Sequence, residues 1–192
     1  MPRTLRSTRT SKKRFSSLRP RLGPSVNWSF IRKSVARCEE SHSGLCRGSG
    51  KGVSGRPARV VDVHNNCVVN LSPHDDYVTL SYVWGQGVMT EGVATATNTS
   101  ISSLQEPGSL SSSRHVLPKT IRDAMVVCRK IGFRYLWVDS LCIIQDDPED
   151  LREQIALMCD IYSGSYLTII AADGDHADVG LPGVLDGPMR DS

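Results

Sequence analysis

Two short polar segments in the second half of the chain carry the side chains that could do chemistry. Trp84-Gly85 ends one β-rich run, and Asp139-Ser140 ends a buried-looking run over residues 134–138. Functional groups in an open α/β sheet collect beyond the C-terminal ends of the strands, so we expect the two segments to meet there. A carboxylate, a hydroxyl and an indole N–H at one sheet edge would form a small polar pocket or a contact surface.

A wider candidate surface includes the neighbours of these segments. Its members end a strand or lie in the loop before the next helix, and they are Tyr82, Trp84, Gly85, Asp139, Ser140, Cys142, Gln145 and Asp146. The structural alternative is that Asp139 caps nearby backbone N–H groups while Trp84 packs beneath the loop. Both interpretations stay open at this stage.

Cys142 has a functional and a structural interpretation of its own. A thiol near a helix N-terminus has a lowered pKa and becomes a nucleophile. However, the residues beside Cys142 are apolar, and no His/Asn signature accompanies it. We therefore predict that Cys142 is a small buried hydrophobe, and that Cys128 and Cys159 are core residues on or beside apolar helical faces.

Cys38, His42 and Cys46 offer three soft metal ligands at a spacing that could align on a helix. Zinc sites normally use four ligands, and Gly44 with the Gly-rich run after Cys46 opposes a long helix. We therefore predict no metal. No P-loop, dinucleotide fingerprint, HExxH or GxSxG string is present either, so no cofactor is expected.

Two helices that would position the candidate surface are predicted after residue 117. The first covers 119–131, because Pro118 suits its start, Gly132 suits its end, and its apolar residues repeat with helical spacing. The second covers 148–162, with Asp147 as N-cap. Its apolar face is predicted to consist of Leu151, Ile155, Met158 and Tyr162.

Three strands are predicted at 78–83, 134–138 and 166–171. Their alternation with helices implies parallel strands with right-handed crossovers. The β-rich runs at 58–63 and 67–71 favour an N-terminal β-hairpin. The predicted fold class is therefore α/β, a largely parallel sheet with flanking helices plus that hairpin. Shorter helical elements are expected at 28–37 and near 101–104, the latter within a long segment that shows no clear period.

Charge divides the chain into a basic tail and an acidic remainder. Residues 1 to 22 hold eight of the 23 Lys and Arg residues and no Asp or Glu, so the rest has 15 basic against 20 acidic residues. Residues 1–26 are predicted to be a disordered basic tail, and a transit peptide is the alternative. Since the tail has almost no interleaved aromatics, we expect no specific nucleic-acid binding.

No apolar run is long enough to span a bilayer, and no apolar region near the N-terminus suits a secretion signal. We therefore predict a cytoplasmic protein whose six cysteines are reduced thiols.

Several ordered blocks resemble the fungal heterokaryon incompatibility (HET) domain. They are Tyr77-Val78-Thr79-Leu80-Ser81-Tyr82-Val83-Trp84-Gly85, then residues 117–124 and 135–147, then Met158, Ile161-Tyr162 and 167–172. Trp28, Cys38, His42, Cys46 and Gly180-Leu181-Pro182-Gly183 fit the looser part of the pattern. The resemblance implies a HET domain at 27–184, between the basic tail and a C-terminal tail at 185–192.

The resemblance implies a signalling or interaction role in fungal non-self recognition and programmed cell death. Other proteins, or a second copy of the chain, would be the partners. The family often carries Trp where this chain has Leu151, and a long C-terminal region usually follows the domain. The chain is therefore expected to be truncated relative to the family.

HET domains are viewed as remote relatives of TIR domains, some of which cleave NAD. The resemblance therefore implies a TIR-like (flavodoxin-like) layout, and it keeps an NAD hydrolase or an inactive remnant as alternatives. The TIR catalytic Glu lies on a helix after the last of these strands, whereas residues 173–192 contain no Glu. No catalytic residue is carried over, enzymatic activity stays open, and NAD is expected only under that alternative.

Overall fold

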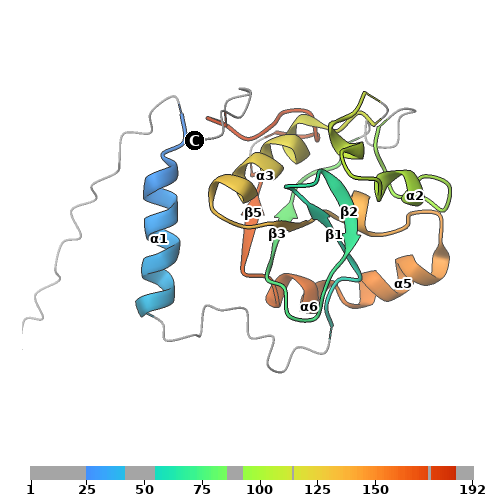
Figure 1. Cartoon of the computed structure of the whole chain (residues 1–192), viewed down its shortest axis with the longest axis horizontal. Helices are drawn as coiled ribbons and strands as arrows, with labels where there is room; N and C mark the ends of the chain where they lie inside the picture. The colour runs from blue at the N-terminus through green and yellow to red at the C-terminus, as the bar shows by residue number, and fades with distance from the viewer. Residues whose placement is uncertain (1–24, 42–54, 86–92, 114, 173, 185–192) are drawn as a thin grey trace, which may run out of the picture.

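The structure, a computed structural model, describes residues 25–41, 55–85, 93–113, 115–172 and 174–184. A five-stranded sheet lies between helices (Figure 1). Most of the predicted basic tail and all of the predicted C-terminal tail lie outside the described residues. The elements in chain order are α1 (Trp28–Ser41), β1 (Arg59–Asp62), β2 (Cys67–Asn70), β3 (Tyr77–Ser81), α2 (Ile101–Leu104), η1 (Ser109–Ser111), α3 (Lys119–Lys130), β4 (Tyr135–Trp137), α4 (Asp139–Cys142), α5 (Pro148–Ala156), α6 (Met158–Ser163) and β5 (Leu167–Ile170).

The sheet is mixed, with strand order β2-β1-β4-β3-β5. The three strands predicted to be parallel neighbours are confirmed, since β3 pairs parallel with both β4 and β5. The prediction of a largely parallel sheet is wrong, because β1 pairs antiparallel with β2 and also with β4. A strand joined to its neighbour by a tight turn must run antiparallel to it, and the β1–β2 pair as a whole is added to the edge of β4.

Asp62 organises the turn between β1 and β2. Its carboxylate accepts hydrogen bonds from the backbone N–H groups of His64 (2.9 Å) and Asn65 (3.0 Å), and from the Arg134 guanidinium (2.8 Å). Burial alone would raise the pKa of Asp62, but the hydrogen bonds and the charge of Arg134 outweigh burial and lower the pKa. Because Arg134 immediately precedes β4, this ion pair joins the β1–β2 turn to the centre of the sheet.

Helices cover both faces of the sheet (Figure 1). The helix α3 buries Ile121, Ala124 and Cys128 against one face. On the other face, the Tyr77 hydroxyl donates to the Ile161 carbonyl in α6 (2.7 Å), and the Tyr162 hydroxyl donates to a carbonyl of β3 (3.2 Å). The two faces are therefore covered by the two connections that link the parallel strands.

The predicted helix over 148–162 is two helices, because α5 ends at Ala156 and α6 begins at Met158. The predicted apolar face is also wrong at one position. Ile155 is 53% exposed, whereas Gln154 is only 2% exposed and accepts a hydrogen bond from the Ala58 N–H (3.5 Å). Cys159, predicted to be a core residue, is exposed in α6. Gln154 therefore lies in the core at the point where the apolar periodicity predicted Ile155, because its side chain hydrogen-bonds to the backbone.

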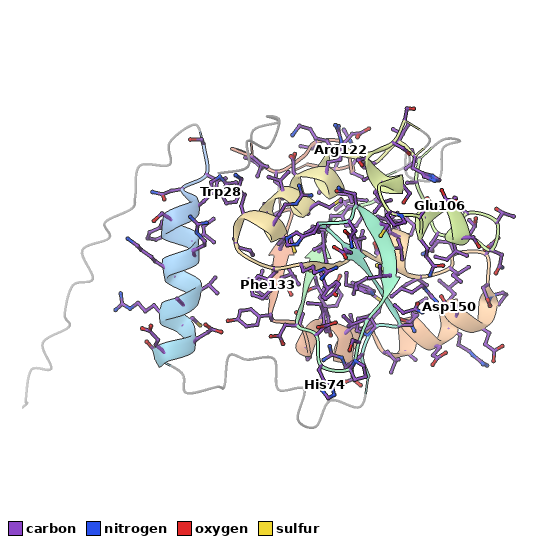
Figure 2. All side chains as sticks on the ribbon, in the orientation of Figure 1. Trp28, His74, Glu106, Arg122, Phe133 and Asp150 are labelled. Carbon is purple, nitrogen blue, oxygen red and sulfur yellow. The ribbon has the colours of Figure 1, made fainter. Side chains whose placement is uncertain are left out.

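The helix α1 extends the predicted element at 28–37 to Ser41, and none of its residues is buried. It begins where the Asn27 side chain accepts a hydrogen bond from the Phe30 N–H (2.9 Å). It lies beside the domain at the β5 edge of the sheet (Figure 1), and Figure 2 shows Trp28 on the side that faces the domain. The segment between β3 and α3 contains α2, as predicted near 101–104, and the short 3-10 helix η1.

Candidate functional site

The connections between the parallel strands mark a candidate site beyond the C-terminal ends of β3 and β5. Among the parallel strands, the chain goes from the central β3 to β4 through α3, and from β4 across to β5 through α5 and α6. Since these connections cover opposite faces, the strand order reverses between β3 and β5. Ligand and contact sites in α/β sheets collect at such reversal points.

Trp84 and Asp139 meet beyond the ends of their strands, as the sequence predicts. The Trp84 Nε1–H donates to Asp139 Oδ2 at 2.8 Å, and the Ser140 N–H donates to Asp139 Oδ1 at 2.7 Å. Asp139 therefore accepts a backbone hydrogen bond, as the structural alternative expects, and also orients an indole from another strand. Both residues are only half-buried, so their surfaces are accessible in part.

The environment of Asp139 raises the pKa of its carboxyl group. Burial is the largest cause, and the hydrogen bonds from Trp84 and Ser140 offset it only in part. Among the ion pairs of the described residues, none involves Asp139. The carboxyl group can therefore hold or exchange a proton at pH values where an ordinary aspartate is already ionised.

Tyr82 and Ser140 complete the polar layer beneath Asp139. The Tyr82 hydroxyl donates to Ser140 Oγ at 2.9 Å, and Ser140 is fully buried. Burial, followed by the nearby negative charge of Asp139, raises the pKa of Tyr82 far above its ordinary value. The phenol therefore stays protonated and serves as a fixed hydrogen-bond donor.

Gly85 brings a residue to the site that sequence reasoning missed. Its φ is +69°, and a Cβ built there would lie 2.6 Å from His176 Cβ and 2.9 Å from His176 Cα. Both the left-handed backbone and the close approach require glycine. His176 follows β5 by six residues, and its Nδ1 accepts a hydrogen bond from the Asp178 N–H (3.2 Å). Its place just beyond the third parallel strand was the signal available in the sequence.

Residues 174–184, here named the closing segment, are tied to the start of α3. The Thr120 N–H donates to the Ala177 carbonyl (2.9 Å), and the Gly180 N–H donates back to Thr120 Oγ1 (3.0 Å). The Leu181 N–H donates to Oδ2 of the buried Asp123 (2.7 Å). These bonds fix the segment that carries His176, which lies beside Gly85, to the start of α3.

The remaining predicted site residues support the loop rather than the Trp84–Asp139 pair. Cys142 is fully buried, and burial raises the pKa of its thiol to about 12, so the prediction of a buried hydrophobe is confirmed. The Gln145 side chain donates to the Asp139 carbonyl (3.1 Å). Asp146 accepts a hydrogen bond from the Asn98 N–H (2.7 Å) and thereby ties its loop to the segment before α2.

The described residues contain no group of three His, Cys, Asp or Glu side chains that could hold a metal ion. Cys38 lies in α1, and the other two weak metal candidates, His42 and Cys46, lie outside the described residues. Within the described ranges, no helix is both long and apolar enough to cross a membrane.

Comparison with known proteins identifies the part of the chain that contains this site. The family model described as Heterokaryon incompatibility protein (HET) matches residues 77–190, more than half of the chain, and the match begins at the first residue of β3. A relative from Neurospora crassa, Heterokaryon incompatibility protein 6, OR allele, is 33% identical over 100 residues. That alignment covers 52% of this chain but 15% of the relative, and no solved structure matches. The chain belongs to the heterokaryon incompatibility (HET) family.

Proposed function

We propose that this chain acts in fungal heterokaryon incompatibility as a module that relays non-self recognition toward programmed cell death. Membership of the HET family supports the role in incompatibility, and so does the printed name of the Neurospora crassa relative. The observation that carries the mechanism is the 2.8 Å hydrogen bond between Trp84 and Asp139. It joins two separate blocks of the matched region into one surface.

The surface around Trp84 has the properties of a protein contact site. The indole is held by Asp139 yet is partly exposed, and the neighbouring Val83 is 52% exposed. Trp side chains that are fixed in one rotamer lose little entropy on binding, which makes them frequent anchors of protein interfaces. In this proposal the partner is another protein or a second copy, the compartment is the cytoplasm, and no cofactor is required.

The second candidate function is NAD hydrolysis on a TIR-like layout. In its favour, the parallel strands follow the order β4-β3-β5, which matches the start of a flavodoxin-like sheet, and the pKa of Asp139 is raised toward the range of a general acid. Against it, the segment after β5 has no Glu. We therefore expect no NAD cleavage above background.

Expression in a fungal host, scored for growth arrest, tests the proposal. Wild type and Glu153→Ala, an exposed control on α5, should arrest growth, whereas Asp139→Ala should not. Trp84→Phe, which keeps a ring but removes the N–H donor, should weaken the arrest. Melting curves of the purified variants must show that each one is folded.

Two outcomes would contradict this reasoning. Growth arrest that survives Asp139→Ala would mean that the functional surface lies elsewhere. NAD turnover by the purified protein, lost in Asp139→Ala and kept in Glu153→Ala, would replace the signalling role with the enzymatic one.

A further inference from the structure

The sequence of the edge strand β5 has none of the residues that usually protect a sheet edge. Every residue from Ser163 to Ala172 is uncharged, and none is proline. Natural edges are commonly guarded by charged side chains, proline or bulges, because unpaired backbone groups attract other strands. β5 instead presents Leu167-Thr168-Ile169-Ile170, and Ile170 at its end is 68% exposed.

The backbone of β5 has hydrogen-bonding groups on its outer side. β3 pairs with it along one side only, where Val78 is opposite Leu167 and the Ala171 N–H donates to the Ser81 carbonyl (2.9 Å). Because alternate residues of a strand direct their N–H and C=O groups to opposite sides, those of Thr168 and Ile170 point away from β3. Another strand could pair with these groups in register.

The helix α1 covers this edge without pairing with it. A helix uses its own backbone groups internally, so it shields a strand edge but cannot extend the ladder. The contact is also incomplete, because a cavity of about 90 Å³ lies between Val35 and Cys38 of α1 and Tyr166 and Leu167 at the start of β5. The Arg32 guanidinium of α1 donates to the Lys130 carbonyl (3.4 Å), but no residue of α1 is buried, so displacing this cover costs less than unpacking a core helix.

We propose that β5 is the surface through which two copies of this chain associate, edge to edge and antiparallel, once α1 has moved away. In a two-fold pair the same segment of each copy faces the other, and because this segment is uncharged, no like charges meet. Its branched side chains also suit cross-strand contacts. The proposal extends the protein-contact role proposed above, but its test measures assembly and does not depend on growth arrest.

The test uses the full chain and measures mass by light scattering or sedimentation over a range of concentrations. Val35→Asp places a charge against β5 and should release α1, whereas Ala36→Asp adds the same charge on the exposed side. We expect Val35→Asp to dimerise at a roughly tenfold lower concentration than wild type, from the lost burial of one half-buried Val. Ala36→Asp should behave as wild type.

A second pair of variants tests the edge itself. In the Val35→Asp background, Ile170→Lys should abolish the dimer, whereas Ile155→Lys, which puts the same charge on an exposed Ile of α5, should not. Hydrogen exchange of the dimer should show new protection at the amides of Thr168 and Ile170.

Three results would overturn the proposal. The first is that Val35→Asp and Ile31→Asp, which both change half-buried positions of α1, stay monomeric at every concentration. The second is a dimer that Ile170→Lys leaves intact. The third is a dimer with no added protection in β5, since that would place the interface elsewhere.

Discussion

Replacing Gly85 by alanine should destabilise the domain more than the same change at another left-handed glycine. Gly108 is the matched control, because its φ is +81° and a Cβ there would meet nothing within 4 Å. Gly85, at φ +69°, would place its Cβ 2.6 Å from His176 Cβ. The two variants therefore share the backbone strain, and only one of them has the steric conflict.

The expected magnitudes follow from these two contributions. An alanine in the left-handed backbone conformation destabilises the folded state by about 1–2 kcal/mol. Replacing glycine by alanine also lowers the entropy of the unfolded chain, which stabilises the protein by about 0.4–1 kcal/mol. Gly108→Ala should therefore lose about 1 kcal/mol, or about 2–4 °C in Tm for a chain of this size. Overpacking against His176 adds about 1–3 kcal/mol, so Gly85→Ala should lose about 3 kcal/mol, or about 6–12 °C.

Urea and thermal unfolding of the two variants would measure this difference, and a double-mutant cycle would assign it. His176→Gly removes the Cβ that conflicts with the new side chain, so it should rescue part of the loss in Gly85→Ala. A coupling of about 1 kcal/mol or more is expected. Equal losses for Gly85→Ala and Gly108→Ala, or coupling below about 0.5 kcal/mol, would refute the packing of the closing segment against β3.

Three further predictions concern the core and the two perturbed carboxyl groups. Ile161→Asp should prevent folding because it buries an unpaired charge, whereas Ile155→Asp should change Tm by less than about 2 °C; circular dichroism melts distinguish them. Asp62→Asn should be less stable than wild type above pH about 4. Urea unfolding should show that the difference in free energy of unfolding between the two proteins becomes smaller as pH falls through the lowered pKa of Asp62. For Asp139 the pH dependence runs the other way, because its raised pKa means that the folded state binds the proton more tightly than the unfolded state. Its contribution to the free energy of unfolding should therefore fall as pH rises from about 4 through its raised pKa, and Asp139→Asn should remove this pH dependence.

Local signals predicted the elements that local interactions determine. Asp147 caps α5 through its carboxylate, which accepts from the Glu149 N–H at 3.0 Å, and the helix begins at the next residue as expected. Gly132, at φ +96°, lies just past the end of α3. Such caps involve residues a few positions apart, so their partners can be read from the sequence.

The features that sequence reasoning missed depend on contacts between distant residues. The antiparallel pairing of β1 with β4 places Asp62 opposite Tyr135, and the adjacent ion pair joins Asp62 to Arg134, 72 positions away. The burial of Gln154 depends on Ala58, 96 positions away. The position of His176 beyond the third parallel strand could suggest that it lies near the site, but its close approach to Gly85, 91 positions away, depends on the tertiary fold.

The closing segment has a consequence for the order in which a growing chain acquires its site. Synthesis at about 5–20 residues per second delivers Asp139 about 2–7 s before His176, which lies 37 positions later. During that interval a nascent chain can join Trp84 to Asp139, but it still lacks the residue that packs against Gly85. An early stop codon between β5 and His176 would leave the product in that state permanently, with the residues of all three parallel strands present but none of the closing segment from His176 onward.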